Sequence, residues 1–296
     1  MTMTSYQIPL ISGQQRFGAL LKIIDEKGNS GWGDVAPLPK WSTETLEQSL
    51  SQLQQKKAEI LNTDWTLQNY EQNFLRLSLF PSVIFGLESA LLSILSPLTP
   101  FSVPTSALFM GSPQEILEQA RARQSEGFLS AKLKVGNLSF DDAAYVIHQL
   151  KDKFNLRIDV NRAWETADSL RFFSQFANDA FDYVEEPFKN PHDLIQFQHP
   201  LAVDESFPQD LSLTQLEALP QLKALIYKPT IQGGLLGCRA LHEWATKRNV
   251  SLILSSSFES YIGLSNVASI AHRLSIPFPV GIGTYHHMLI NNPVTV

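Results

Sequence analysis

Apolar and polar residues follow two different patterns before and after about residue 100. Over residues 4 to 36, apolar side chains such as Tyr6, Ile8 and Leu10 occupy alternate positions, and "DEKGNSGWG" (25–33) is rich in turn-forming residues. Alternation with a period of two predicts half-buried strands, and a turn between two such runs predicts a hairpin. We therefore expect antiparallel strands at the beginning of the chain.

Helical spacing of the apolar residues replaces this alternation after residue 41. The segment "STETLEQSLSQLQQKKAEIL" (42–61) opens with Ser42 or Thr43 as a candidate cap, followed by Glu47, and "SVIFGLESALLSIL" (82–95) follows Pro81. Both patterns are typical of amphipathic or buried helices with an N-terminal signal. Strands followed by helices predict an α+β domain over residues 1–100.

From Val103 onward, short apolar runs alternate with helical stretches such as "SPQEILEQARARQSEG". Seven runs fit strands, namely "TSALF", "LSAKLKV", "NLRIDV", "FDYVEEP", "PLAVDES", "ALIYKPT" and "SLILSSS", and "PFPVGIG" (277–283) is a candidate eighth. Strand–helix alternation predicts a parallel sheet, and no glycine-rich dinucleotide motif follows the first strand. We therefore expect an α/β fold, a modified TIM barrel of the (β/α)7β type, over residues 101–284, with residues 285–296 returning to an N-terminal capping domain.

Composition and charge limit the classes of function. The chain has 296 residues, 44% of them apolar, a formal net charge of −6 and a single cysteine, Cys238. An acidic chain is a poor partner for nucleic acid or an anionic membrane, so a small-molecule ligand is expected. The sequence also lacks the pattern of a signal peptide or a membrane span, and one cysteine fits a reducing cytoplasm. It does not indicate an oligomeric state.

Two lysines share one face of the predicted strand "LSAKLKV". Lys132 and Lys134 alternate with Leu129, Ala131 and Leu133, so both ammonium groups point the same way. An ordinary interpretation is a solvated edge strand. Alternatively, each charge disfavours the other, which would lower the pKa of a lysine and make it a base.

Acidic residues close three neighbouring strands of the predicted barrel. They are Asp159 in "LRIDVNRAW", Glu185 in "YVEEP" and Asp204 in "LAVDES". Each could cap a helix or be solvated, but the carboxyl ends of barrel strands meet at one mouth, where three carboxylates would repel one another unless a cation lay among them. A set of oxygen ligands suits Mg²⁺, with Mn²⁺ as a possible substitute.

Lysines near such a cation suggest a specific chemistry. A lysine removes the proton next to a substrate carboxylate, and the cation stabilises the enediolate that results. Lys228 in "LIYKPT" closes the sixth strand and would enter the mouth from the opposite side. The sequence therefore predicts an enzyme that acts on a small carboxylate.

Taken in order, these motifs resemble the o-succinylbenzoate synthase family of the enolase superfamily. "GWGDVAPLPKWSTET" and "PSVIFGLESAL" resemble its capping domain, and "AKLKVG", "DVNRAW", "VEEP", "VDES", "YKPT" with "QGG", and "SSSFES" resemble its barrel. The resemblance implies that Asp159, Glu185 and Asp204 are the metal ligands. It implies that Lys134 is the base and then the acid, that Lys132 tunes it, and that Lys228 stabilises the enediolate.

The same resemblance implies a substrate and residues that bind it. The substrate would be 2-succinyl-6-hydroxy-2,4-cyclohexadiene-1-carboxylate, which loses water in menaquinone biosynthesis. "NRAW" brings Asn161 and Arg162, and "SSSFES" brings Ser256 and Ser257. "SGQQRFG" (12–18), with Arg16, falls where the family has a loop that closes over the substrate, although a hairpin tip rich in Gln and Gly would have the same pattern. Tyr261 departs from the small residue that many relatives have after "ES".

The site residues alone leave other activities open. The same set would serve a dipeptide epimerase, an N-succinylamino acid racemase or a muconate cycloisomerase, because lysines on both faces permit a 1,1-proton transfer. A different class is an inactive barrel that acts as a binding module.

Overall fold

The computed structural model describes residues 1–289, so the last part of the predicted C-terminal segment lies outside the described residues. The chain divides into two compact units. The first comprises residues 1–103, 227–244 and the chain from 254 onward, and the second comprises residues 104–226 and 245–253. No helix of residues 1–289 has the length and apolar character needed to cross a membrane.

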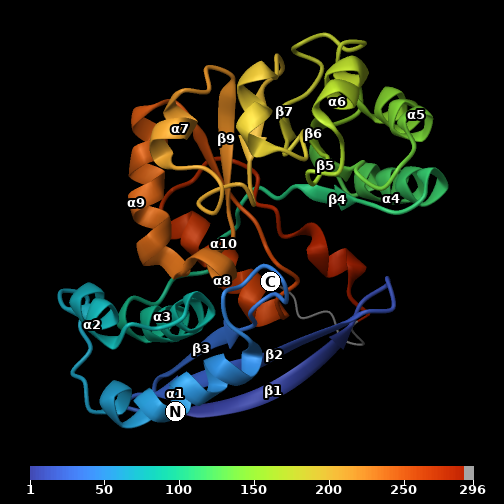
Figure 1. The fold of residues 1–296 in the computed structure, drawn as a ribbon. Helices are drawn as coiled ribbons and strands as arrows, with labels where there is room; N and C mark the ends of the chain where they lie inside the picture. Colours follow the sequence, from blue (N-terminus) through green and yellow to red (C-terminus); the bar gives the residue numbers. More distant parts are fainter. Residues whose placement is uncertain (290–296) are drawn as a thin grey trace. The chain divides into compact units, whose positions relative to one another are not determined.

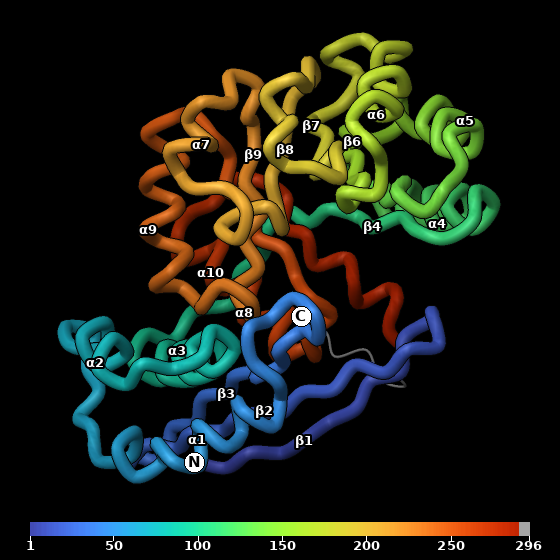
Figure 2. The backbone as a smooth tube through the Cα atoms, viewed as in Figure 1, coloured from blue at the N-terminus to red at the C-terminus, as the bar shows by residue number. Residues whose placement is uncertain are grey.

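The first unit contains a three-stranded antiparallel sheet, as the alternating pattern predicts. Its strands follow the chain in the order β1 (Thr2–Pro9), β2 (Gln15–Ile24) and β3 (Ser30–Val35). Figure 2 shows β1 and β2 as a long hairpin. Tyr6 pairs with Gly18 across β1 and β2, and Ala19 pairs with Val35 across β2 and β3. Ala19 and Leu21 lie on the buried face of β2.

Three helices follow this sheet: α1 (Leu46–Leu61), α2 (Tyr70–Leu77) and α3 (Pro81–Leu95). The predicted cap of α1 is wrong by a few residues, because Thr45 and Gln48 form the capping box in place of Ser42 or Thr43 with Glu47. The sequence analysis did not predict α2. Helix α3 packs against β3, and glycine at Gly33 and Gly86 permits this close approach. A Cβ on Gly33 would overlap the Gly86 backbone, and a Cβ on Gly86 would overlap the Val35 side chain.

Later segments of the chain complete the first unit. They are α8 (Pro229–Gln232), most of α9 (Gly234–Lys247), α10 (Tyr261–Arg273) and the 3-10 helix η2 (Gly283–His287). Ser260 caps α10, so Tyr261 begins this helix. Near the end of the described chain, Met288 forms an antiparallel bridge with Leu10, and the Leu289 N–H donates to the Pro9 carbonyl.

The second unit is built on the predicted parallel sheet. Seven strands lie in the order β10-β9-β8-β7-β6-β5-β4 and form a curled sheet (Figure 1). Their bounds are β4 (Ala107–Phe109), β5 (Ser130–Lys134), β6 (Asn155–Asp159), β7 (Tyr183–Glu185), β8 (Leu201–Val203), β9 (Leu222–Tyr227) and β10 (Ser251–Leu254). The (β/α) barrel class with an N-terminal α+β portion is therefore confirmed. At the expected eighth strand the structure has a single parallel bridge, between Ser255 and Gly281 in the first unit.

Helices connect most of these strands, although less evenly than the sequence suggests. They are α4 (Pro113–Ser125), α5 (Phe140–Leu150), α6 (Thr166–Phe173) and the short α7 (Leu213–Glu217). The connection after β7 contains only the 3-10 helix η1 (Pro191–Gln196). An aromatic cluster fills the space under α6: Phe173 is fully buried and its ring meets those of Trp164, Phe181 and Phe197 at centroid distances of 5.4 to 6.1 Å.

Candidate active site

The ends of four neighbouring strands carry a row of charged residues in the second unit. Lys134 pairs with Asp159 across β5 and β6, and Asp159 pairs with Glu185 across β6 and β7. Asp204 directly follows β8, the next strand of the sheet. Side chains at matched positions of neighbouring parallel strands point to the same face. The parallel register therefore places this row at the carboxyl end of the sheet, as expected from the sequence.

Lys132, two residues before Lys134 on β5, contacts two of the acids in this row. Its Nζ lies 2.8 Å from Asp159 Oδ2 and 2.6 Å from Glu185 Oε1. Both carboxylates are fully buried, and only 16% of the Lys132 side chain is exposed. Leu129, which precedes β5, is by contrast 81% exposed and does not belong to the buried face of the strand.

The charges of the acids control the ionisation of Lys132. Burial lowers the pKa of this lysine, but the negative charges of Asp159, Glu185 and Asp204 outweigh burial and hold its pKa well above the ordinary value. The sequence-based expectation that crowding with Lys134 would lower the pKa of Lys132 is therefore wrong for this structure. For Asp159, burial raises the pKa, and the ammonium groups of Lys132 and Lys134 outweigh burial and lower it.

Lys134 has a different environment from Lys132. Its Nζ donates to Asn161 Oδ1 at 2.7 Å and lies 3.1 Å from Asp159 Oδ2, and its side chain is 32% exposed. The Asn161 N–H in turn donates to Asp159 Oδ1 at 2.9 Å, and Asn161 has a positive φ of 50°. The turn after β6 therefore places an amide oxygen against the more accessible of the two lysines.

Arg162 is the next residue of this turn and faces another partner. Its Nη1 donates to Asp210 Oδ2 at 2.6 Å, and its Nε and Nη2 donate to the Lys189 carbonyl. Its backbone N–H donates to the Glu186 carbonyl. Arg162 therefore links the segments that follow β6, β7 and β8 by hydrogen bonds. Its role in substrate binding stays a prediction.

Glu186 belongs to the site although the sequence analysis did not select it. Its side chain is fully buried: Oε1 accepts the backbone N–H groups of Asp204 and Ser206, and Oε2 accepts the Ser206 hydroxyl at 2.6 Å. Burial raises the pKa of Glu186 to about 7. The second glutamate of "VEEP" thus positions the loop that carries Asp204. Its adjacency to Glu185 was the only signal in the sequence.

The chemistry of the acids fits a hard divalent cation. Within residues 1–289, no three His, Cys, Asp or Glu side chains are grouped as ligands of one ion, because Lys132 lies between Asp159 and Glu185. The three carboxylates still share one neighbourhood and supply only oxygen donors. Asp159 Oδ2, although near two ammonium groups, is buried without a well-aligned hydrogen bond. Oxygen donors of this kind suit Mg²⁺.

The first unit holds the other lysine expected from the sequence. Lys228 immediately follows β9, its Nζ lies 5.2 Å from the centroid of the Trp41 ring, and its N–H donates to Gln232 Oε1 at 2.8 Å. A cation over an indole face is attracted by the ring quadrupole. This contact restrains the direction of the ammonium group.

The serine segment after β10 is held by a buried network in the first unit. The Ser256 hydroxyl lies 2.7 Å from that of Thr284, and the Ser257 N–H donates to Glu259 Oε2 at 2.6 Å. The Ser257 hydroxyl is buried without a hydrogen-bond partner among residues 1–289. The roles of Ser256 and Ser257 in binding a carboxylate stay predictions.

Arg16 belongs to the same network. It is 4% exposed, and its guanidinium donates to the backbone carbonyls of Ser257, Phe17, Pro37 and Ala36. Arg16 lies near the beginning of β2, so its side chain ties this strand to the serine segment. Contact between Arg16 and a substrate stays a prediction.

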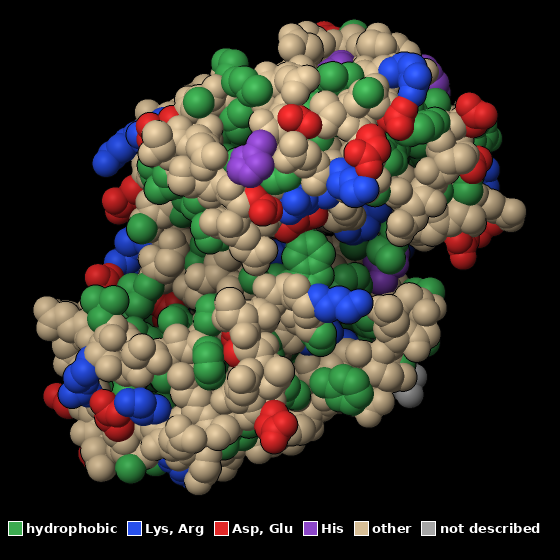
Figure 3. Space-filling view, viewed as in Figure 1, with side chains coloured by type: hydrophobic (Ala, Val, Ile, Leu, Met, Phe, Trp, Pro, Cys, Tyr) green, Lys and Arg blue, Asp and Glu red, His purple; other side chains and the backbone are tan. Residues whose placement is uncertain are grey.

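The surface carries charges of both signs. On the face that Figure 3 displays, acidic and basic side chains are interspersed rather than gathered into one extended basic area. This distribution agrees with the net charge of −6 and gives no indication of a nucleic-acid partner.

Comparison with known proteins covers nearly the whole chain. Residues 115–291 match a family model described as "Enolase C-terminal domain-like", and residues 5–94 match one described as "MenC, N-terminal domain". The chain is 31% identical to o-succinylbenzoate synthase of Edwardsiella ictaluri over 303 residues, which cover 96% of this chain and 89% of that protein.

Two solved structures illustrate the likeness in fold. One is o-succinylbenzoate synthase of Thermosynechococcus elongatus complexed with Mg in the active site, with a TM-score of 0.73, 24% identity and coverage of 95% of this chain and 92% of that chain. The other is the L-Ala-D/L-Glu epimerase of Bacillus subtilis, with a TM-score of 0.83, 17% identity and coverage of 98% and 90%. Both likenesses concern the fold.

Proposed function

Because the chain belongs to the o-succinylbenzoate synthase family of the enolase superfamily, we propose that it dehydrates 2-succinyl-6-hydroxy-2,4-cyclohexadiene-1-carboxylate to 2-succinylbenzoate in menaquinone biosynthesis. The enzyme is a carbon–oxygen lyase that acts on a small molecule. The observation that carries the proposal is the pair of buried carboxylates, Asp159 and Glu185, on the Lys132 ammonium group. The charge of Asp204 acts on the same ammonium group. Acids placed in this way are suited to hold a divalent cation, whose positive charge would stabilise a substrate enediolate.

Lys134 is the proposed base. It has one carboxylate contact, at 3.1 Å, whereas Lys132 has two that are shorter. Its Nζ would take the proton from the carbon next to the substrate carboxylate. The carbon–oxygen bond of the ring hydroxyl then breaks, the departing oxygen takes that proton from Lys134, and water leaves an aromatic ring. Lys132, held between Asp159 and Glu185, would remain charged and contact the substrate carboxylate.

Asp159, Glu185 and Asp204 are the residues that would hold Mg²⁺, with Mn²⁺ as a substitute. When bound, the cation would supply positive charge for the developing enediolate. Mg was present in the active site of the Thermosynechococcus elongatus enzyme. Glu186 would keep Asp204 in place through the backbone of the 204–206 loop.

The remaining site residues have proposed roles in orientation. Lys228 would stabilise the enediolate, and Asn161, by accepting from the Lys134 ammonium, would direct that group. Arg162, Arg16, Ser256 and Ser257 would shape the pocket or bind the substrate carboxylates. The capping portion would comprise residues 1–100 and the catalytic barrel residues 101–284. A cytoplasmic location is part of the proposal and agrees with the buried, single Cys238.

A 1,1-proton transfer is the nearest alternative. It would use the same lysines, and the fold resembles that of a dipeptide epimerase at a TM-score of 0.83. That likeness comes with 17% identity, whereas the synthases reach about 30% over most of their length. The match in sequence therefore favours dehydration.

The test is turnover with defined substrates in the presence of Mg²⁺. We expect the ultraviolet absorbance to report formation of 2-succinylbenzoate from the hydroxycyclohexadiene. Exchange of the α-proton of an N-succinylamino acid for deuterium, without any aromatisation of the diene, would assign the racemase activity instead. Binding of the diene with no chemistry on either substrate would identify an inactive binding module.

A further inference from the structure

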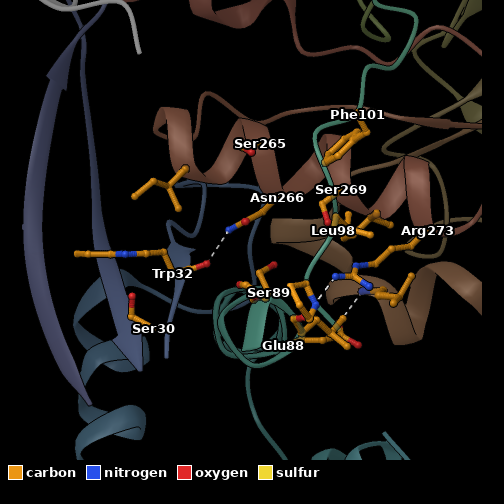
Figure 4. A pocket seen from close by; sticks show the side chains of 16 residues that line it. Ser30, Trp32, Glu88, Ser89, Leu98, Phe101, Ser265, Asn266, Ser269 and Arg273 are labelled. Atoms are coloured by element: carbon orange, nitrogen blue, oxygen red, sulfur yellow. Dashed lines mark hydrogen bonds between the residues drawn. The ribbon is translucent and has the colours of Figure 1, made fainter. Parts of the chain in front are cut away.

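A cavity of about 360 Å³ lies within the first unit, apart from the lysines and acids of the candidate site. Helices α3 and α10, strand β3 and the segment 97–101 provide its walls (Figure 4). Its size falls within the range of small-molecule pockets, which is roughly 300 to 1,000 Å³. The walls combine apolar side chains, such as Leu98 and Phe101, with an equal share of polar ones, among them Arg273 and Glu88.

Arg273 supplies a positive charge that forms no salt bridge with a carboxylate among the described residues, and Glu88 is the carboxyl group that influences it electrostatically. Its guanidinium donates to the Ser96 carbonyl at 2.6 Å, the Leu92 carbonyl at 3.3 Å and the Ser96 hydroxyl at 3.2 Å. All three acceptors are neutral. A partly buried guanidinium with neutral partners favours an anion, and its planar donors match a carboxylate.

Glu88 supplies a second polar group, which is 1% exposed. Its Oε2 accepts the Leu235 N–H at 2.5 Å at the beginning of α9, while Oε1 has no hydrogen-bond partner within residues 1–289. Burial raises the pKa of Glu88 to about 8, so near neutral pH this carboxyl is mainly protonated and has a hydrogen to donate. A buried polar atom of this kind destabilises the folded state unless it has a hydrogen-bond partner.

We propose that this cavity binds a small organic carboxylate with an apolar or aromatic body, whose carboxylate pairs with Arg273 and whose body packs against Phe101 and Leu98. A second acceptor on the ligand would meet Glu88. In Figure 4, Ser269 lies between Phe101 and Arg273, and all three residues line the cavity. The inference does not depend on the proposed enzymatic reaction, because none of the proposed catalytic or metal-binding residues lines the cavity.

Benzoate is a suitable probe, because it carries one carboxylate on one aromatic ring, and benzamide and benzylamine are its neutral and cationic counterparts. Isothermal titration calorimetry of the full chain would measure binding of each. We expect benzoate to bind at least about tenfold more tightly than benzamide, the gain of a charge-assisted pair. Equal binding of benzoate and benzamide, or tighter binding of benzylamine, would overturn the proposal.

Substitutions at two positions separate binding in this cavity from any binding of benzoate at the catalytic residues. Ser269→Leu fills the cavity without changing its charge, so the binding isotherm should lose one site. Arg273→Met should weaken that site at least about tenfold, and Arg273→Lys, which keeps a positive charge, should recover part of the loss. Arg76→Met, at an exposed arginine of the same unit, is the matched control and should bind like the unaltered protein. Binding that is unchanged in Ser269→Leu would place benzoate elsewhere and refute the assignment.

Discussion

Asp159 and Glu185 are direct partners across the parallel strands β6 and β7, so two fully buried carboxylates stand side by side. Two such anions repel each other and have lost the solvation that water would give. The Lys132 ammonium, 2.8 Å from one and 2.6 Å from the other, offsets part of this cost. The arrangement provides the physical basis for the proposed cation site.

Replacement of Asp159 by Asn should therefore weaken binding of Mg²⁺ or Mn²⁺. An amide keeps the shape of the side chain but removes its charge, and we expect the affinity to fall on the order of 100-fold. Titration calorimetry with Mn²⁺ measures the change. Asp152→Asn, at an acid that is 81% exposed, is the control and should leave the affinity unaltered. An unchanged affinity in Asp159→Asn would remove this residue from the ligand set.

Lys134→Ala should abolish most turnover without loss of the fold. Loss of a positioned base typically lowers kcat by about 100- to 10,000-fold. The rate of aromatisation gives kcat, and circular dichroism reports whether the protein remains folded. Lys153→Ala, at an exposed lysine of the same unit, should turn over at the unaltered rate. If Lys134→Ala remained fully active, another group would have to be the base.

The sequence was informative about the strands and the charged residues that close them. Apolar runs of β5 to β9 each end in a charged residue, and the parallel order of these strands brings Lys132, Asp159 and Glu185 into contact. The motif order also identified the family, since each motif lies on a successive strand. The metal-binding and substrate-binding roles themselves stay predictions.

Features that depend on distances between segments escaped the sequence analysis. The raised pKa of Lys132 results from three carboxylates on other strands, whereas the sequence displays only its neighbour Lys134. The burial of Glu186 likewise depends on the 204–206 loop. The cap at Thr45 was misplaced because several residues of "STETLEQ" are competent caps, and only the backbone decides among them.

Glu186→Ala should lower metal affinity although Glu186 is not a proposed ligand. The substitution removes the acceptor of the Asp204 and Ser206 N–H groups and so releases the loop that carries Asp204. Substitution of a residue that orients a metal ligand typically lowers the affinity for the metal about 10- to 100-fold. Glu186→Gln retains a carbonyl acceptor and should keep most of the affinity. Equal affinities in the Ala variant and the unaltered protein would contradict the positioning role.

Phe173→Ala should strongly destabilise the second unit. The ring is fully buried among Trp164, Phe181 and Phe197, and its removal leaves a cavity that these rings fill only in part. Such substitutions cost about 3–5 kcal/mol in the free energy of unfolding. Urea denaturation followed by circular dichroism measures the loss. Ile195→Ala, at a side chain that is 52% exposed, should cost less than about 1 kcal/mol, and a similar loss in both variants would contradict the prediction.

Stability should fall with rising pH because of Glu88. Burial raises the pKa of this carboxyl from 4.5 to about 8, so between these values the folded protein keeps a proton that the unfolded chain has released. The free energy of unfolding therefore decreases as the pH rises through this window, and above about 8 the folded state has to bury an anion.

Glu88→Gln removes this titration and retains an acceptor for the Leu235 N–H. Relative to the unaltered protein, the variant should gain stability as the pH rises, by roughly 1 to 3 kcal/mol between about pH 5 and pH 9. Urea denaturation across this range measures the difference in the free energy of unfolding between the variant and the unaltered protein. Glu26→Gln, at an exposed glutamate, is the control, for which this difference should not change with pH. A difference between Glu88→Gln and the unaltered protein that does not change with pH would mean that the folded state does not retain the proton. Glu88 would then be an anion over the whole range, and its charge would offset that of Arg273 and disfavour an anionic ligand in that cavity.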